Sequence, residues 1–439
     1  MFEKRAWLIV SLIVAALSTA DAQSDRLPAG QKWVATWAAS VHGPYPSGNP
    51  SAQPDMKFAF PDPAQGAVDQ SFRLIVKPDL WGDRVRIRLA NTFGTQPVTF
   101  SAIHVGVSAA AGNVVKGTNR AVPFGGQRSV TIAPGASRYS DPVDLKLPAG
   151  ALMDGRKLAV SFHIAGSSGP MTWHAKALQT SYITRPRSGD HSSDENDFNY
   201  PFTTTSWYFL DAVDMMAPAD TVVVAAFGDS ITDGTLSTLN GDDRWPDVFS
   251  RRLHAAYGNR VSVVNAGIGG NRILTPESYP PPQPFPGGPS ALQRLDRDVL
   301  GLSGLSAVVL LEGINDISSG ATPDAIIAGM KELVSRVRAR GIKIVAATIT
   351  PSLTANGNSG TPDANARRQA VNTFIRTGGL FDAVADFDAA TVDEATGALR
   401  EEFVPNSTIG GAGDRLHPNR AGYQAMGSAI QLEIFRPGR

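Results

Sequence analysis

Short apolar runs separated by turn-forming residues characterise the chain from residue 30 to about 215. Val, Ile, Phe, Thr and Trp fill the runs, and Gly, Pro, Asn and Asp separate them, which is typical of β-strands joined by turns. Residues 84–89 (Arg-Val-Arg-Ile-Arg-Leu) alternate strictly, as expected for a strand with one solvent-exposed face. These features predict an all-β sandwich of jelly-roll type over residues 23–218. The expected strands are 32–38, 71–76, 84–89, 98–107, 129–132, 157–164 and 203–210.

The pattern changes at about residue 219, where continuous apolar runs begin to alternate with stretches of helical spacing. Strands that are apolar throughout, each followed by a helix, indicate a parallel sheet covered on both faces. Residues 219–439 are therefore expected to form an α/β domain. The expected strands are 221–227, 261–264, 307–311, 342–349 and 383–387. The expected helices are 244–257, 290–302, 323–340, 364–376 and a last helix that Pro418 opens and that runs to about Phe435.

Two irregular segments interrupt the second pattern. Residues 275–289 contain seven prolines, and residues 353–363 are rich in Gly, Asn, Ser and Thr. Both follow strands, on the side where open α/β sheets bind ligands. They are either walls of a substrate site or ordinary solvent-exposed loops.

Charge and cysteine content narrow the classes of partner. The chain of 439 residues carries 40 basic and 40 acidic residues, so its formal net charge is zero. We therefore expect no nucleic-acid partner and no electrostatic attraction to an anionic membrane. The chain has no cysteine, which excludes disulfides, a thiol nucleophile and thiolate ligands for zinc.

The N-terminus has the pattern of a secretory signal peptide. Two basic residues at 4–5 precede a mostly apolar stretch at 7–16, and residues 20–22 (Ala-Asp-Ala) fit a small-x-small cleavage site. An uncleaved anchor helix is the alternative, but the apolar stretch is short for a membrane span. We expect residues 1–22 to be a cleaved signal peptide. The mature protein would start at Gln23 and be secreted or periplasmic, without stable membrane insertion.

Four short polar blocks in the second half carry candidate chemistry. Three follow successive apolar strands, at 228–230 (Gly-Asp-Ser), 265–270 (Asn-Ala-Gly-Ile-Gly-Gly) and 313–316 (Gly-Ile-Asn-Asp). The fourth, at 414–417 (Asp-Arg-Leu-His), precedes the last expected helix. Because the carboxyl ends of parallel strands meet at one edge of a sheet, we expect the blocks to converge there.

Ser230 is the candidate nucleophile, because it lies between a buried strand and a helix N-terminus that favours developing negative charge. His417 can accept its proton and return it to a leaving alcohol, and Asp414 can stabilise the imidazolium. The histidines at 163 and 174 lie in the β region, away from the blocks. Taken singly, Gly-Asp-Ser could be a capped turn, and a lone histidine is more often a structural residue. Taken together, the blocks predict a catalytic triad of Ser230, His417 and Asp414.

A tetrahedral intermediate also needs hydrogen-bond donors for its oxyanion. The candidates are the backbone N–H groups of Ser230 and Gly270 and the side-chain amide of Asn315. Gly270 could instead serve only the turn in which it lies, and Asn315 could serve an Asx turn.

These blocks resemble those of the SGNH (GDSL-type) serine hydrolase superfamily over residues of about 221–435. The resemblance implies a three-layer α/β/α flavodoxin-like domain with a serine nucleophile, glycine and asparagine oxyanion donors and a histidine base. It implies no metal and no organic cofactor. Ile231 stands where the family name has Leu, at a position expected to serve packing. More narrowly, residues 227–234 (Phe-Gly-Asp-Ser-Ile-Thr-Asp-Gly) and 243–246 (Asp-Arg-Trp-Pro) look similar to the xylan acetylesterase-like branch, which points to a carbohydrate esterase.

We therefore expect an exported serine esterase that hydrolyses short-chain esters, above all acetyl esters of carbohydrate, through an acyl-enzyme. One alternative is a lipase, lysophospholipase or aryl-esterase that acts on longer acyl chains. Another is a glycan-binding module with a vestigial hydrolase. Five of the seven tryptophans lie in the β region, either as a sugar-stacking platform or as core residues. The substrate would be a small-molecule or polysaccharide ester, and the oligomeric state is left open.

Overall fold

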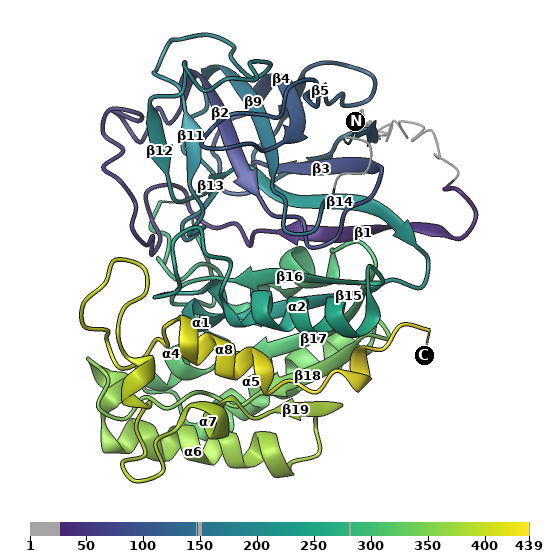
Figure 1. Cartoon of the computed structure of the whole chain (residues 1–439). Helices are drawn as coiled ribbons and strands as arrows, with labels where there is room; N and C mark the ends of the chain where they lie inside the picture. The colour runs from purple at the N-terminus through teal and green to yellow at the C-terminus, as the bar shows by residue number, and fades with distance from the viewer. Residues whose placement is uncertain (1–26, 146, 148–151, 281, 439) are drawn as a thin grey trace, which may run out of the picture.

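The computed structural model describes residues 27–145, 147, 152–280 and 282–438, and shows a β domain stacked on an α/β domain (Figure 1). The signal peptide expected at 1–22 lies outside the described residues. None of the helices in the described part of the chain has the length and apolar character needed to pass through a membrane.

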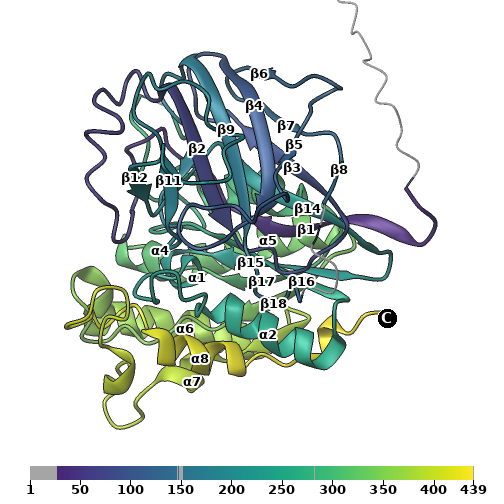
Figure 2. The same cartoon turned by 45° about the horizontal axis from the view of Figure 1, so that its top comes forward.

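The N-terminal domain is a sandwich of two antiparallel sheets (Figure 2). One sheet has the strand order β1-β14-β3-β7, with β8 also paired to β3. The other has the order β12-β11-β2-β9-β4-β5, with β6 paired to β4, and β10 and β13 form a separate ladder. The expected all-β sandwich is confirmed. The strands are β1 (Gln31–Ala38), β2 (Val68–Val76), β3 (Arg84–Ala90), β4 (Val98–Val107), β5 (Arg120–Ala121), β6 (Val130–Ile132), β7 (Ser137–Tyr139), β8 (Val143–Asp144), β9 (Leu158–Ser167), β10 (Trp173–His174), β11 (Ser181–Ile183), β12 (Phe202–Thr204), β13 (Trp207–Tyr208) and β14 (Leu210–Pro218).

An aromatic core holds the sandwich together. Phe72 of β2 and Phe162 of β9 stack with their ring centroids 5.2 Å apart, a geometry that adds to the free energy of burying the two rings. Trp37, Trp173 and Trp207 are 7%, 1% and 5% exposed. These three tryptophans are therefore core residues, and their ring faces are not open to a sugar.

The alternating strand β3 turns its polar side toward the α/β domain. Its apolar positions are buried in the sandwich. On the other side, Arg86 pairs with Asp214 of β14 at 2.8 Å and donates to Ser303 of the second domain at 3.0 Å. The face that the sequence pattern predicts to be solvent-exposed thus contacts the second domain at Arg86.

The C-terminal domain is built on five parallel strands in the order β16-β15-β17-β18-β19. Counted along the chain, this is the order 2-1-3-4-5 of flavodoxin-like sheets. The fifth strand is shorter than expected, because Phe387 opens a helix instead of closing the strand. The strands are β15 (Val222–Gly228), β16 (Val261–Gly267), β17 (Leu305–Leu311), β18 (Lys343–Ala347) and β19 (Ala383–Ala385).

Helices cover both faces of this sheet, which confirms the expected three-layer α/β/α domain. One face is covered by α3 (Ala291–Leu295), α5 (Pro323–Arg338) and α6 (Pro362–Thr377). The other is covered by α2 (Trp245–Tyr257), α7 (Phe387–Thr391) and α8 (Arg420–Ser428). The shorter helical elements are α1 (Ser230–Asp233), α4 (Ile314–Ser318), the π-helical η1 (Asp296–Leu300) and the 3-10 turns η2 (Asn358–Gly360), η3 (Glu401–Phe403) and η4 (Glu433–Phe435).

The last α-helix, α8, is shorter than expected. It begins at Arg420 and not at Pro418, because the Asn419 side chain accepts hydrogen bonds from two first-turn N–H groups at 2.9 and 3.1 Å. It ends at Ser428, and a separate 3-10 turn follows at 433–435.

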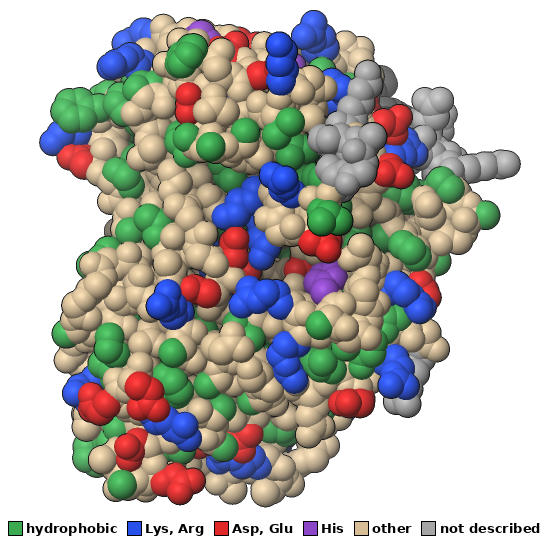
Figure 3. All heavy atoms as spheres, in the orientation of Figure 1, with side chains coloured by type: hydrophobic (Ala, Val, Ile, Leu, Met, Phe, Trp, Pro, Cys, Tyr) green, Lys and Arg blue, Asp and Glu red, His purple; other side chains and the backbone are tan. Residues whose placement is uncertain are grey.

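Strand β1 joins the two domains. Three of its residues are buried in the core of the α/β domain: Val34, Ala35 and Ala38. Ser262 Oγ–H of β16 donates to the Ala35 carbonyl at 2.8 Å. Asp79, which follows β2, accepts from the Val263 N–H at 2.7 Å and lies 3.0 Å from His254 Nε2 of α2. Charged side chains of both signs gather along the hollow between the domains (Figure 3).

Candidate active site

Ser230 stands at the sharp turn between β15 and α1. The Asp229 side chain caps the helix by accepting a first-turn N–H at 2.9 Å. Gly234, with φ 102°, ends the helix after one turn, and its N–H donates to the Ser230 carbonyl. Gly228 allows the tight turn, because a Cβ there would lie 2.5 Å from the Leu311 carbonyl oxygen. Ser230 is 7% exposed, so its hydroxyl lies just below the surface.

Two short hydrogen bonds link Ser230, His417 and Asp414. Ser230 Oγ lies 2.7 Å from His417 Nε2, and His417 Nδ1 lies 2.6 Å from Asp414 Oδ2. A carboxylate can only accept, so Nδ1 carries the ring proton and the lone pair on Nε2 faces the serine hydroxyl. Burial alone would raise the pKa of Asp414, but its hydrogen bonds with His417 hold that pKa well below its usual range. The structure thus brings together the three residues that the sequence predicts to be a triad.

The predicted oxyanion donors Gly270 and Asn315 belong to segments that contact the residues flanking Ser230. Within the described residues, neither the Ser230 nor the Gly270 backbone N–H has a hydrogen-bond partner. Asn315, in α4, donates one amide hydrogen to the Asn271 carbonyl at 2.9 Å. Its Nδ2 also lies 3.5 Å from the Asp229 carboxylate, which is the outer limit of a hydrogen bond. The two backbone N–H groups therefore remain available to a ligand oxygen, and the Asn315 amide can donate to one only by giving up its long contact with Asp229.

Arg294 of α3 is fully buried and forms hydrogen bonds with the strand ends that precede the blocks at 228–230 and 265–270. Its guanidinium donates to the carbonyls of Gly228 and Ala266 at 2.8 and 2.7 Å, and to Asn271 Oδ1 at 2.8 Å. Asp298, one turn later, balances its charge at 3.3 Å. The sequence analysis missed this residue, because no local pattern distinguishes a buried arginine from an exposed one.

Three carboxyl groups are buried near this arginine: Asp229, Glu312 and Asp316. Burial raises the pKa of Asp229 to about 7 and that of Glu312 well above its usual range, and repulsion from Asp316 acts on both in the same direction. The cluster therefore favours a proton on at least one carboxyl at neutral pH over three negative charges. Within the described residues, no group of three or more histidine, aspartate or glutamate side chains is placed to hold a metal ion.

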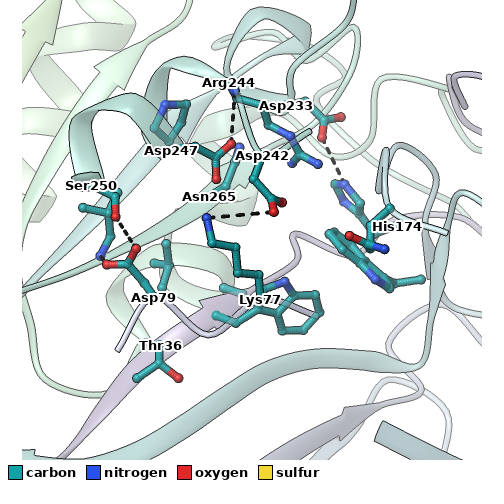
Figure 4. Close-up of a pocket in the computed structure, with 17 residues that line it drawn as sticks. Thr36, Lys77, Asp79, His174, Asp233, Asp242, Arg244, Asp247, Ser250 and Asn265 are labelled. Carbon is teal, nitrogen blue, oxygen red and sulfur yellow. Dashed lines mark hydrogen bonds and ion pairs between the residues drawn. The ribbon is translucent and has the colours of Figure 1, made fainter. Parts of the chain in front are cut away.

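The β domain contacts the helix that carries the nucleophile. His174 Nε2 of β10 lies 3.1 Å from Asp233 Oδ1 in α1, and Asp233 Oδ2 accepts the Gly269 N–H at 2.9 Å. His174 and Asp233 line an interdomain cavity of about 60 Å³, together with charged residues of both domains (Figure 4). That volume suits a few water molecules and excludes a sugar or an acyl chain. The sequence analysis set His174 aside because it lies in the β region, and its partner Asp233 is far away in the sequence.

The two irregular segments lie beside these residues. Residues 275–289 pack on the β domain, where Ser47 Oγ–H donates to the Pro284 carbonyl at 3.1 Å. In the segment 353–363, a backbone N–H donates to the Asp414 carbonyl at 3.3 Å. Each segment therefore contacts another part of the molecule, while many of its described residues are exposed to solvent.

A family model matches the part of the chain that holds all four blocks. The model describes the GDSL-like Lipase/Acylhydrolase family, and the match covers residues 226–425. The C-terminal domain belongs to this family. The sequence resemblance to GDSL-type hydrolases is thereby confirmed, and the domain is that of an ester or acyl hydrolase.

The solved structures similar to this chain cover about half of it. A GDSL-like lipase from Bacteroides thetaiotaomicron is 19% identical and covers 48% of this chain and 86% of its own, with a TM-score of 0.35. A carbohydrate acetylesterase from Sinorhizobium meliloti is 16% identical, with coverages of 48% and 96% and a TM-score of 0.35. A member of the lipolytic protein G-D-S-L family from Veillonella parvula is 19% identical, with coverages of 49% and 98% and a TM-score of 0.35. Comparison with curated proteins gave no match.

Proposed function

We propose that the protein is an exported serine esterase that hydrolyses short-chain esters, above all acetyl esters, on carbohydrate. The observation that carries the proposal is the hydrogen-bonded chain from Ser230 Oγ through His417 to Asp414, with distances of 2.7 and 2.6 Å. A serine hydroxyl is a weak nucleophile until a positioned base can take its proton. This geometry supplies the base and the carboxylate that orients it.

In the proposed reaction, Ser230 Oγ attacks the acyl carbonyl while His417 Nε2 takes the hydroxyl proton. The oxyanion that forms accepts hydrogen bonds from the backbone N–H groups of Ser230 and Gly270 and from the Asn315 amide. His417 then protonates the leaving alcohol, and an acyl-enzyme remains on Ser230. Water, deprotonated by His417, attacks this ester, releases the carboxylic acid and restores the serine.

Polar surroundings support a polar substrate. A shallow hollow of about 420 Å³ adjoins the segment that carries His417. Its lining has five polar residues and three without a polar side chain: Thr238, Asn406, Ser407, Asn419, Arg420, Pro405, Gly410 and Ala421. Among the described residues of the α/β domain, Ile409 is the only large hydrophobic side chain that is strongly exposed. Hydroxyl, amide and guanidinium groups suit a hydroxyl-rich substrate, whereas a long acyl chain needs an apolar groove.

The proposal is tested by acetate release from a panel of acetylated xylan, mannan and pectin. Ser230→Ala should abolish release, while Ser237→Ala should leave it unchanged. Ser237 is a matched control, because it is buried in the same segment and its hydroxyl has no hydrogen-bond partner among the described residues. Acetate release by Ser230→Ala at the wild-type rate would refute the serine mechanism.

The acyl chain length is tested separately with p-nitrophenyl esters. We expect kcat/KM to be highest for the acetate and to fall beyond the butyrate. A rise with chain length would instead support the longer-chain alternative. Export is tested by mass spectrometry of the protein recovered outside the cytoplasm, which should start at Gln23.

A further inference from the structure

The Gly269–Gly270 peptide, which carries one proposed oxyanion donor, is bound by a side chain of the β domain. Asn49 Nδ2 donates to the Gly269 carbonyl at 2.7 Å. That carbonyl and the Gly270 N–H belong to the same peptide group. The bond is trans, so the two groups point in opposite directions. When Asn49 holds the carbonyl, it thereby sets the direction of the N–H.

The peptide between two glycines needs a contact from another segment to fix its orientation. Neither residue has a Cβ, so the peptide between them can rotate more freely than any other. Gly270 has φ 84°, a region that other residues rarely adopt. The β domain fills the space that side chains would take, because a Cβ on Gly270 would lie 2.8 Å from Asn49 Nδ2 and one on Gly269 would lie 3.0 Å from Lys176 Cε.

The amide on the other side of Gly269 is held through a second residue of the β domain. Its N–H donates to Asp233 Oδ2, and Asp233 Oδ1 lies 3.1 Å from His174 Nε2. His174 Nδ1 lies 2.9 Å from the Ser40 carbonyl. Both ring nitrogens thus face only acceptors, so the ring must donate from both and is an imidazolium. The glycine segment is held by a buried ion pair on one side and by an amide on the other.

We propose that the β domain orients the oxyanion donor of the hydrolase domain, with Asn49 as its positioning residue. The inference rests on the proposed function, because it needs Gly270 N–H to stabilise the transition state. Asn49 does not touch the reacting atoms. It acts by keeping the Gly269–Gly270 peptide in one orientation before the substrate arrives, so that no rearrangement is needed during the reaction.

The test compares the full-length wild type with Asn49→Leu and Asn49→Asp in steady-state hydrolysis of p-nitrophenyl acetate. Leu removes the donor at similar size, and Asp places a repelling carboxylate against the Gly269 carbonyl. Losing an oxyanion donor outright costs about 10²- to 10³-fold in kcat. We expect kcat to fall about 10-fold for Leu and further for Asp, with KM changed less than about twofold, because a misdirected donor is less harmful than a missing one.

Ser47→Ala is the matched control. Ser47 lies in the same loop and also donates across the domain boundary, but to the Pro284 carbonyl. We expect its kcat to stay within about twofold of the wild-type value. A second measurement is inhibition by phenylboronic acid, whose tetrahedral adduct with Ser230 places an oxygen in the oxyanion site. Its Ki should rise for Asn49→Leu in proportion to the loss in kcat/KM, which loss of a merely structural contact would not produce.

The outcomes separate this inference from the proposed function. If Ser230→Ala retains turnover, the serine mechanism fails and the inference fails with it. If turnover depends on Ser230 but kcat is unchanged in both Asn49 variants, only the inference is overturned. An equal loss in Ser47→Ala would also overturn it, since any contact between the domains would then serve. Asn49 is exposed, so the variants should melt at the wild-type temperature; if Asn49→Leu does not, Asn49→Ser is judged by the same criteria.

Discussion

Two histidine–aspartate pairs contact the segment that carries Ser230, and they differ in what the second ring nitrogen faces. In the pair of His417 and Asp414, Nε2 faces the Ser230 hydroxyl, which can donate a proton. In the pair of His174 and Asp233, the other nitrogen faces the Ser40 carbonyl, which can only accept. The first ring can therefore act as a base, whereas the second must keep both protons. An aspartate partner alone does not make a histidine a base. The histidine can act as one only if its other ring nitrogen faces a group that can donate a proton.

Burial reinforces this difference. His174 and Asp233 are 3% and 1% exposed, inside the domain interface, whereas His417 and Asp414 are only partly buried in the α/β domain. A buried ion pair that loses one member leaves an uncompensated charge, which is costly. The comparison predicts that substitutions of His417 or Asp414 lower activity. Substitutions of His174 or Asp233 should instead lower stability.

The largest expected effect is that of His417→Ala. Without the base, kcat for p-nitrophenyl acetate should fall roughly 10⁴- to 10⁶-fold, as it does when a triad serine hydrolase loses its histidine. The urea unfolding midpoint should stay close to the wild-type value. If activity stays within tenfold of the wild type, another residue is the base and the comparison does not hold.

Asp414→Asn should have the next largest effect. An amide can donate to Nδ1, which favours the tautomer whose Nε2 carries the proton and so cannot accept one from Ser230. We expect a loss in kcat of about 10⁴-fold. A crystal structure of the variant should retain the positions of Ser230 and His417, because the amide has the shape of the carboxylate. A loss below tenfold would contradict the role assigned to the acid.

His174→Leu tests the second pair through stability. It leaves Asp233 buried without its cation, and we expect the free energy of unfolding in urea to fall by about 3–5 kcal/mol. The control is His191→Leu, which removes a half-exposed histidine that lies 3.0 Å from Asp194. That change should cost no more than about 1 kcal/mol. Equal losses in the two variants would mean that burial is not the deciding difference.

The smallest predicted effect is a pH dependence of the stability difference between wild type and His174→Leu. Burial alone would lower the pKa of His174, but Asp233 and the backbone raise it above 6.5. Arg244 opposes this rise, and two further groups that can carry positive charge, His42 and Lys176, lie nearby. Because the folded pKa is the higher one, the contribution is complete below pH 6.5 and is lost as the pH rises through the folded value. The pKa of Asp233 is lowered from 3.8, so its contribution is lost only in acid, below that value.

The unfolding free energies of the two proteins should therefore differ most between about pH 4 and 6.5 and converge as the pH is raised. Activity should instead fall as the pH is lowered, since protonated His417 cannot accept the proton of Ser230. A stability difference that grows toward alkaline pH would show that His174 is neutral in the folded protein.

The sequence predicted what local patterns encode. Continuous apolar runs predicted the strands of the parallel sheet, and the blocks at their ends made Ser230 and Asn315 candidate site residues. Contacts between distant segments have no such signature. Asn49 lies in a loop, and nothing near it in the sequence indicates that it binds Gly269. For the same reason, the alternation at 84–89 predicted the strand correctly but not that Arg86 contacts a second domain.

The contact of β1 with β16 has a further consequence for a chain that begins at residue 219. Strand β16 is one of the two edge strands of its sheet, and its segment 261–264 (Val-Ser-Val-Val) has no charge and no proline. Such a strand pairs readily with another copy of itself when it is uncovered. In the whole protein, Asp79 occupies the N–H of Val263 and β1 lies against the strand. The β domain thus also protects the hydrolase domain from self-association, and we expect the shortened chain to precipitate before its activity can be measured.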